Sequence, residues 1–293
     1  MIHHIEICSH PVFIIGSPRS GTTALGKALG RHSQLWASEE SFILSSLFGD
    51  GRVEREYQRW AARGSSWLSV QHVDQREFLR YVGLGLNALF TSRSSGKRWI
   101  DHTPHYGFMV DALADMFPGA YFLHILRDGR AVVNSMMNLQ NRVKEHVRAE
   151  MLAGNYLPEW TRDVRKACEA WRESVEAGMA AVEKHPDRCL TVRHAELTAS
   201  PEVEFTRIFQ FMDLPFERGP IDFWRSTKIN SSFLQDSSDS AVTRDHAPWM
   251  NWSPEWRDAF REEAAATMVA CGLGSADEWN ELETVPSQSG SRL

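Results

Sequence analysis

The chain reads PVFIIGSPRSGTT over residues 11–23, a short apolar run followed by a glycine-rich turn. Residues 11–16 are rich in valine and isoleucine and end in glycine, which is typical of a buried parallel strand. Residues 22–30, TTALGKALG, carry their apolar side chains on one side and predict a helix that starts at the turn. A strand, a glycine turn and a helix in this order are the structural context of a phosphate-binding loop.

The turn matches the Walker A pattern G-x-x-x-x-G-K-[ST] at every position except the lysine. Gly16 and Gly21 have the required separation and Thr23 supplies the hydroxyl, but Thr22 stands where the lysine should be. Backbone N–H groups of such a loop bind an anion, and the lysine reaches the outer phosphates of a nucleoside triphosphate. Arg19, inside the loop, is the cation expected to contact the bound group. The loop therefore favours a single phosphate joined to a second small anionic group.

The rest of the chain alternates between apolar runs and helical patterns. Further buried strands are expected at residues 98–101, 120–126 and 190–194. Helices are expected at residues 53–62, 75–92, 108–116, 157–184, 200–212 and 254–270. This order predicts the α/β class: a P-loop-type, doubly wound parallel sheet flanked by helices, with its ligand at the carboxyl ends of the strands. We expect a single domain over residues 1–275 and a disordered tail over 276–293.

The composition excludes several function classes. The 293 residues are 42% hydrophobic and 24% charged, with a formal net charge of −6, which argues against nucleic acid or an anionic membrane as the main partner. The four cysteines are scattered without C-x-x-C spacing, so a zinc site is not expected. No apolar run approaches the roughly 20 residues of a membrane span, and no signal peptide is recognisable. These features predict a cytoplasmic protein and leave the oligomeric state open.

Two motifs resemble those of sulfotransferases. Residues 18–23, PRSGTT, resemble the 5′-phosphosulfate loop, in which [KR]-S-G-T-T replaces the Walker lysine. The second signature of that family is an arginine at the end of a strand and a serine eight residues later, which together bind the 3′-phosphate of the donor. The segment FLHILRDGRAVVNS, within residues 120–135, supplies Arg127 and Ser135 at this spacing. The chain is most similar in motif to the tyrosylprotein sulfotransferases and related bacterial sulfotransferases, over about residues 11–272.

The resemblance implies a donor and the residues that hold it. The donor would be 3′-phosphoadenosine 5′-phosphosulfate (PAPS), the product 3′,5′-diphosphoadenosine (PAP), and no metal would be required. The loop residues implied in donor binding are Ser17, Pro18, Arg19, Ser20, Gly21, Thr22 and Thr23. Residues 228–252 resemble a loop that covers the donor, in which Ser231 or Ser232 and Arg244 would contact it. The charged stretch 140–166 is expected to form a lid.

Sulfuryl transfer needs a base for the acceptor hydroxyl and positive charge near the leaving phosphate oxygen. HSQLWASEES, residues 32–41, resembles the family stretch whose second glutamate is the base, which implies Glu40 in that role and Glu39 pointing away. In WIDHTP, residues 99–104, His102 replaces a lysine that stabilises the transferring group in the relatives. Two mechanisms stay open: His102 as a stabiliser beside Glu40, or His102 as the base itself. Arg19 is expected to stabilise the leaving 5′-phosphate through its planar guanidinium.

The acceptor is not identified by any motif. A small-molecule hydroxyl, such as that of a phenol or a secondary-metabolite alcohol, is favoured over a peptide tyrosine because no export signal is recognisable. A first alternative is a P-loop small-molecule kinase that uses ATP and magnesium, in which Asp101 after its short strand would be the candidate metal carboxylate. A second alternative is a non-catalytic binder of phosphoadenosine nucleotides, for which Glu40 and His102 would be dispensable.

Overall fold

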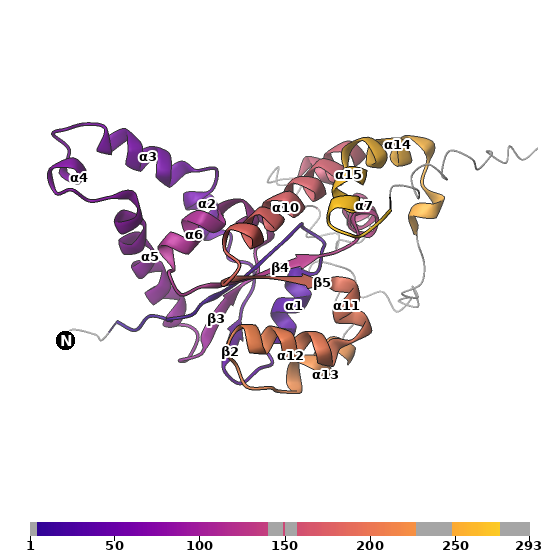
Figure 1. Cartoon of the computed structure of the whole chain (residues 1–293), viewed down its shortest axis with the longest axis horizontal. Helices are drawn as coiled ribbons and strands as arrows, with labels where there is room; N and C mark the ends of the chain where they lie inside the picture. Colours follow the sequence, from indigo (N-terminus) through magenta and orange to yellow (C-terminus); the bar gives the residue numbers. More distant parts are fainter. Residues whose placement is uncertain (1–4, 140–148, 150–156, 227–247, 276–293) are drawn as a thin grey trace, which may run out of the picture. The chain divides into compact units, whose positions relative to one another are not determined.

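The computed structural model describes residues 5–139, 149, 157–226 and 248–275 (Figure 1). The chain forms two compact units, and each is described by itself below. The first comprises Met1–Leu126 with Ser174–Ser232, and the second comprises Arg127–Glu173 with Phe233–Leu293. The organisation of residues 1–275 as one domain stays a prediction.

The first unit is built on a five-stranded parallel sheet in the order β2-β3-β1-β4-β5. The strands are β1 (Val12–Ile15), β2 (Leu35–Ala37), β3 (Arg98–Asp101), β4 (Tyr121–Leu126) and β5 (Cys189–Arg193). The central strand β1 pairs with β3 on one side and β4 on the other, so that Val12 lies opposite both Ile100 and Tyr121. The strand order reverses at β1, and the carboxyl end of such a strand is where open α/β sheets bind their ligands. The glycine turn follows this strand.

Helices cover both faces of the sheet, which confirms the predicted fold class. The helices of the first unit are α1 (Thr22–Leu29), α2 (Ile43–Phe48), α3 (Arg52–Ala61), α4 (Trp67–Val70), α5 (Gln75–Thr91), the 3₁₀ helix η1 (Pro104–Met109), α6 (Val110–Met116), the last part of α10 (Val164–Lys184), α11 (His194–Ala199), α12 (Pro201–Phe211) and α13 (Gly219–Ser226). Alternate residues of β1 point to opposite faces: Ile14 packs in one buried cluster and Phe13 and Ile15 in the other. Burial on both faces explains why this strand is apolar throughout.

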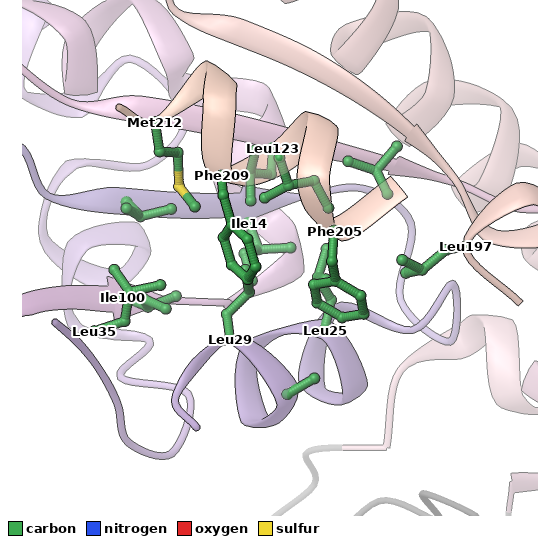
Figure 2. Packing of buried hydrophobic residues seen from close by; sticks show 14 of the residues in the cluster. Ile14, Leu25, Leu29, Leu35, Ile100, Leu123, Leu197, Phe205, Phe209 and Met212 are labelled. Atoms are coloured by element: carbon green, nitrogen blue, oxygen red, sulfur yellow. The ribbon is translucent and has the colours of Figure 1, made fainter. Parts of the chain in front are cut away.

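The cluster around Ile14 fixes helix α1 on the sheet. Figure 2 shows Phe205 and Phe209 of α12 pointing toward Leu25 and Leu29 of α1, and all four side chains are fully buried. Burying an aromatic or leucine side chain contributes about 1.5–3 kcal/mol. The packing therefore holds the start of α1, and with it the glycine turn, rigidly at the end of β1.

The second unit is helical. It contains α7 (Gly129–Met137), η2 (Glu159–Thr161), the first part of α10 (Val164–Lys184), η3 (Pro248–Asn251), α14 (Pro254–Glu263) and α15 (Ala265–Ala270). Trp171 is fully buried in its core, with its ring centroid 6.1 Å from that of Phe260. In neither unit do the described residues include a helix long and apolar enough to cross a membrane.

Several element boundaries differ from the sequence expectation. The long helix begins at Val164 and not at residue 157, because a 3₁₀ turn follows Pro158. The helix expected at 254–270 is two helices, since Ala264 has φ −127° and interrupts it. The helix expected at 108–116 is preceded by the turn η1, which begins at Pro104.

A buried histidine in β4 predicts acid sensitivity. The side chain of His124 is fully buried against Gly178, and neither ring nitrogen makes a hydrogen bond in the described part of the chain. Burial lowers the pKa of His124 to about 4, whereas an unfolded histidine has a pKa near 6.5. The unfolded state therefore takes up the proton first, and stability is lost as pH falls below about 6.5.

We expect the free energy of unfolding to fall by about 2 kcal/mol between pH 7 and pH 5 through this group. Urea unfolding of wild type and His124→Leu at both pH values measures it. The variant should lose less stability on acidification than the wild type, whereas an equal loss in both proteins would contradict the assignment.

Candidate active site

The turn after β1 has the backbone of a phosphate-binding loop. Gly16 has φ +148°, and a Cβ atom there would lie 2.6 Å from the carbonyl oxygen of Ile125, so only glycine fits. Gly21 has φ +109° and precedes α1. Arg19 adopts φ +71°, a conformation that is uncommon for a residue with a side chain. The Ser20 hydroxyl donates to the Ser17 carbonyl oxygen at 2.6 Å, which closes the turn.

The start of α1 can hold an anion. Gly21 has no side chain to cap the helix, so in the described part of the chain the N–H groups of its first turn have no side-chain cap. Helix dipole and backbone donors both favour negative charge at this position. Ser17, Ser20 and Thr22 are buried, and Pro18 is half-buried. The loop thus offers backbone donors that can hold an anion.

Glu40 lies directly against this loop. The Thr23 hydroxyl, in the first turn of α1, donates to Glu40 Oε1 at 2.9 Å. The same oxygen is 3.8 Å from His102 Nδ1. Glu39 is exposed and pairs instead with Lys27, with 3.8 Å between Nζ and the carboxylate. The two neighbouring glutamates therefore have different environments, and Glu40 is the one that faces the loop.

His102 is fully buried, and its Nε2 atom is held by a hydrogen bond. Nε2 lies 2.8 Å from the carbonyl oxygen of Ser38, and because a carbonyl only accepts, Nε2 carries a proton. Nδ1 faces Glu40 and makes no hydrogen bond within the described residues. Burial lowers the pKa of His102, but the Glu40 carboxylate, the Ser38 carbonyl and the charge of Asp101 together raise it above its ordinary value.

Asp101 is buried and binds several protein donors. Its Oδ2 accepts from the Ser41 hydroxyl at 2.5 Å and from the Tyr106 hydroxyl at 3.0 Å. Its Oδ1 accepts from the hydroxyl and the N–H of Thr103 at 2.7 and 3.1 Å. Burial and the charge of Asp101 raise the pKa of Tyr106, so its hydroxyl stays a donor. No sequence motif indicates a role for Ser38, Ser41 or Tyr106.

Helix α1 touches His102 at Gly26. A Cβ atom at Gly26 would lie 2.4 Å from the Cδ2 atom of the His102 ring. Gly26→Ala should therefore displace the imidazole or the helix, with a loss of about 1–3 kcal/mol of stability and a fall in turnover. Gly85→Ala in α5 is the matched control, because no atom lies within 4 Å of the added Cβ.

Gly85→Ala should leave turnover unchanged and raise stability by about 0.4–1 kcal/mol, through the lower entropy of the unfolded chain. Thermal unfolding and initial rates of both variants measure the difference. Equal melting temperatures for the two variants would mean that His102 does not depend on this contact.

Arg127 and Ser135 belong to the second unit. Arg127 directly follows β4, and its carbonyl oxygen accepts from the Trp171 indole at 3.2 Å. Ser135 lies on α7, two turns further along the chain. Asp128 caps α7 and forms a salt bridge with Arg130, with 2.6 Å between its Oδ2 and Nη2. The RDGR turn thus leads from the strand into a helix.

Three predicted donor contacts cannot be placed. Ser231, Ser232 and Arg244 lie outside the described residues, as does most of the stretch 140–166 and the segment 276–293. Of the loop 228–252, only residues 248–252 are described. Over the described ranges, no group of three or more histidine, cysteine, aspartate or glutamate side chains is arranged to hold a metal ion.

Comparison with known proteins identifies the family. A family model described as the sulfotransferase family matches residues 11–218. Protein-tyrosine sulfotransferase A of Caenorhabditis elegans is 26% identical over 239 residues, 79% of this chain and 57% of that protein. Nodulation protein NoeE of Sinorhizobium fredii is 31% identical over 130 residues, 42% of this chain and 30% of that protein. The chain therefore spans only part of these relatives.

Solved sulfotransferase structures are similar to this chain at lower sequence identity. The sulfotransferase domain of the curacin biosynthetic pathway has a TM-score of 0.48 at 21% identity, covering 74% of this chain and 78% of that chain. A mouse sulfotransferase complexed with PAP has a TM-score of 0.47 at 14% identity, covering 95% of this chain and 89% of that chain. The family match spans more than half of the sequence and includes the glycine loop, Glu40, His102 and Arg127, so the chain belongs to the sulfotransferase family.

Proposed function

We propose that the protein transfers a sulfuryl group from PAPS to the hydroxyl of an acceptor. The observation that carries the proposal is the contact between the phosphate-binding loop and a candidate base: Thr23 donates to Glu40, which lies beside buried His102. A loop without the Walker lysine, joined to a carboxylate, suits the transfer of a group attached to a single phosphate. Membership of the sulfotransferase family supports the same donor.

Each end of the donor has its own set of residues in this proposal. The N–H groups at the start of α1 and the guanidinium of Arg19 bind the 5′-phosphosulfate, and Arg19 also stabilises the leaving phosphate oxygen. Arg127 and Ser135 bind the 3′-phosphate. Contacts from Ser231, Ser232 and Arg244 remain predictions.

Glu40 is the proposed base. When bound, PAPS supplies an activated sulfuryl group, whose bond to the 5′-phosphate breaks as the acceptor oxygen bonds to sulfur in line. Glu40 takes the proton of the acceptor hydroxyl, and Thr23 and His102 hold its carboxylate in place. The alternative of His102 as the base is less favoured, because its Nε2 already donates to the Ser38 carbonyl and its ring is fully buried.

The hydrogen bonds that Asp101 accepts argue against the kinase alternative. In a kinase of this type a carboxylate would help to hold the magnesium ion of ATP. The two carboxylate oxygens of Asp101 instead accept four hydrogen bonds from protein groups. The non-catalytic alternative predicts that the wild type binds PAP but transfers no sulfuryl group from PAPS.

The proposed acceptor is a neutral small molecule with a hydroxyl group. Phe42 and Phe108 are 44% and 55% exposed, and the Phe42 ring lies 6.5 Å from the exposed His105 ring, close to Glu40. His105 and Phe108 are three residues apart in η1, and side chains at this spacing in a 3₁₀ helix lie above one another. Exposed aromatic rings near the Glu40 carboxylate suit an uncharged acceptor ring better than an acidic peptide. A cytoplasmic location remains a prediction.

A transfer assay tests the proposal. The protein is incubated with PAPS labelled in the sulfuryl group and with a phenol, an aliphatic alcohol or a tyrosine peptide, without added metal. Labelled product should form, most rapidly with the phenol. A parallel reaction with ATP labelled in the γ-phosphate and with magnesium should give none. Phosphoryl transfer in place of sulfuryl transfer would establish the kinase.

A further inference from the structure

The end of β3 holds the segment that carries Glu40. Asp101, which ends β3, and the next two residues, His102 and Thr103, each form a hydrogen bond with one residue of the segment 38–42. His102 Nε2 donates to the Ser38 carbonyl at 2.8 Å, and the Ser41 hydroxyl donates to Asp101 Oδ2 at 2.5 Å. The Phe42 N–H lies 3.5 Å from the Thr103 hydroxyl oxygen. Glu40 thus lies between two bonds that anchor its chain on either side.

On the C-terminal side of Glu40, the chain is held by the bond from Ser41 to buried Asp101. Asp101 is 3% exposed, and its Oδ2 also accepts from the Tyr106 hydroxyl, which itself lies 2.8 Å from the Ser41 hydroxyl. A buried carboxylate that accepts several hydrogen bonds is rigid, because each partner restricts it. Ser41 is therefore bound to a fixed point in the core and not to a mobile side chain.

The segment 38–42 belongs to no helix or strand. Residues 38–42 lie between β2, which ends at Ala37, and α2, which begins at Ile43. Phe42 adopts the left-handed conformation at φ +52°, which a phenylalanine does not favour unless its surroundings impose it. The bonds from β3 provide that constraint.

We propose that Asp101 is a positioning residue for Glu40, acting through the Ser41 hydroxyl. This inference rests on the proposed function, in which Glu40 is the base. Asp101 does not touch the reacting atoms. It holds the chain so that the Glu40 carboxylate stays between Thr23 and His102, where it can receive the acceptor proton.

Ser41→Ala is the direct test, because it removes the link and leaves Asp101 bound to Tyr106 and Thr103. Turnover should fall by about 10-fold to 100-fold, with the KM for PAPS unchanged, since small displacements of a catalytic group have effects of this size. Asp101→Asn should lower turnover in the same direction. Ser41→Thr keeps the hydroxyl and should restore turnover. Ser45→Ala is the matched control, because that hydroxyl bonds only to the Phe42 carbonyl among the described contacts and should leave turnover unchanged.

A second measurement, the pKa of His102, does not depend on catalysis. The charged groups that face His102 are Glu40 and Asp101, and both raise its pKa. In Ser41→Ala, Asp101 stays in place, so a change in the pKa of His102 reports the position of Glu40. NMR titration of the histidine ring, assigned with His102→Gln, should give a lower pKa in Ser41→Ala than in the wild type and an unchanged one in Ser45→Ala.

The outcomes separate the two hypotheses. Full turnover in Ser41→Ala together with an unchanged pKa of His102 would overturn the role of Asp101. A parallel loss of turnover, PAP affinity and melting temperature would also overturn it, since the bond would then be only structural. If the wild type transfers no sulfuryl group, the proposed function fails, and the NMR titration alone decides whether Asp101 positions Glu40.

Discussion

Replacing Glu40 with glutamine should lower turnover by about 100-fold or more while PAP affinity stays within about twofold of wild type. The amide keeps the size of the side chain but cannot take a proton from the acceptor, and a general base contributes about 10²–10⁴-fold to a rate. PAP binding should persist because the loop and the start of α1 are unchanged. Steady-state rates with PAPS and calorimetric titration with PAP measure the two effects separately.

Glu39→Gln is the control for this experiment. Glu39 is the next residue in the chain, but its carboxylate is exposed and pairs with Lys27 on the outside of α1. Its substitution removes the same charge without touching Thr23 or His102, so turnover should stay within about twofold, as for most exposed ion pairs. Unchanged turnover in Glu40→Gln would move the base to His102. PAP binding without any sulfuryl transfer by the wild type would support the non-catalytic binder.

Replacing Arg127 with alanine should weaken PAP binding by about 10-fold to 100-fold. A hydrogen bond to a charged group contributes about 1.5–3 kcal/mol, and the 3′-phosphate would lose its guanidinium partner. Binding of an adenosine nucleotide that lacks the 3′-phosphate should be affected much less. Titration of the variant with PAP and with ADP measures the difference between the two nucleotides.

Arg130→Ala serves as the control for Arg127. It lies in the same turn, but its guanidinium pairs with Asp128 and lies 4.9 Å from the Trp249 ring centroid. Its loss should leave the preference for PAP over ADP in place. Should Arg127→Ala keep that preference as well, the 3′-phosphate would have to bind elsewhere.

The central part of the fold could be predicted because it depends on local patterns. The strand before Gly16 and the helix after Gly21 are visible as an apolar run and a helical repeat, and both occur where expected. Strand β2 was not expected, because Leu35–Ala37 has only three residues and shows no alternation. The interruption at Ala264 was not expected either, since no glycine or proline marks it.

The candidate site could be predicted only where a motif links residues close in sequence. The glycine loop, Glu40, His102 and Arg127 are all predicted from short motifs that resemble those of sulfotransferases. The bond between Ser41 and Asp101 joins residues 60 positions apart, and no local pattern indicates such a contact. The same is true of the Ser38 carbonyl, since a backbone acceptor leaves no trace in the sequence. Such partners become visible only when the fold places β3 beside the segment 38–42.

Calorimetric titration with PAP, ADP and ATP, each with and without magnesium, tests the central claim most directly. If the loop binds the 5′-phosphate and Arg127 binds the 3′-phosphate, as proposed, PAP should bind with a Kd of about 1 μM or tighter. PAP should bind better than either other nucleotide, and magnesium should not change its affinity. Tighter binding of ATP in the presence of magnesium would contradict the account and favour phosphoryl transfer.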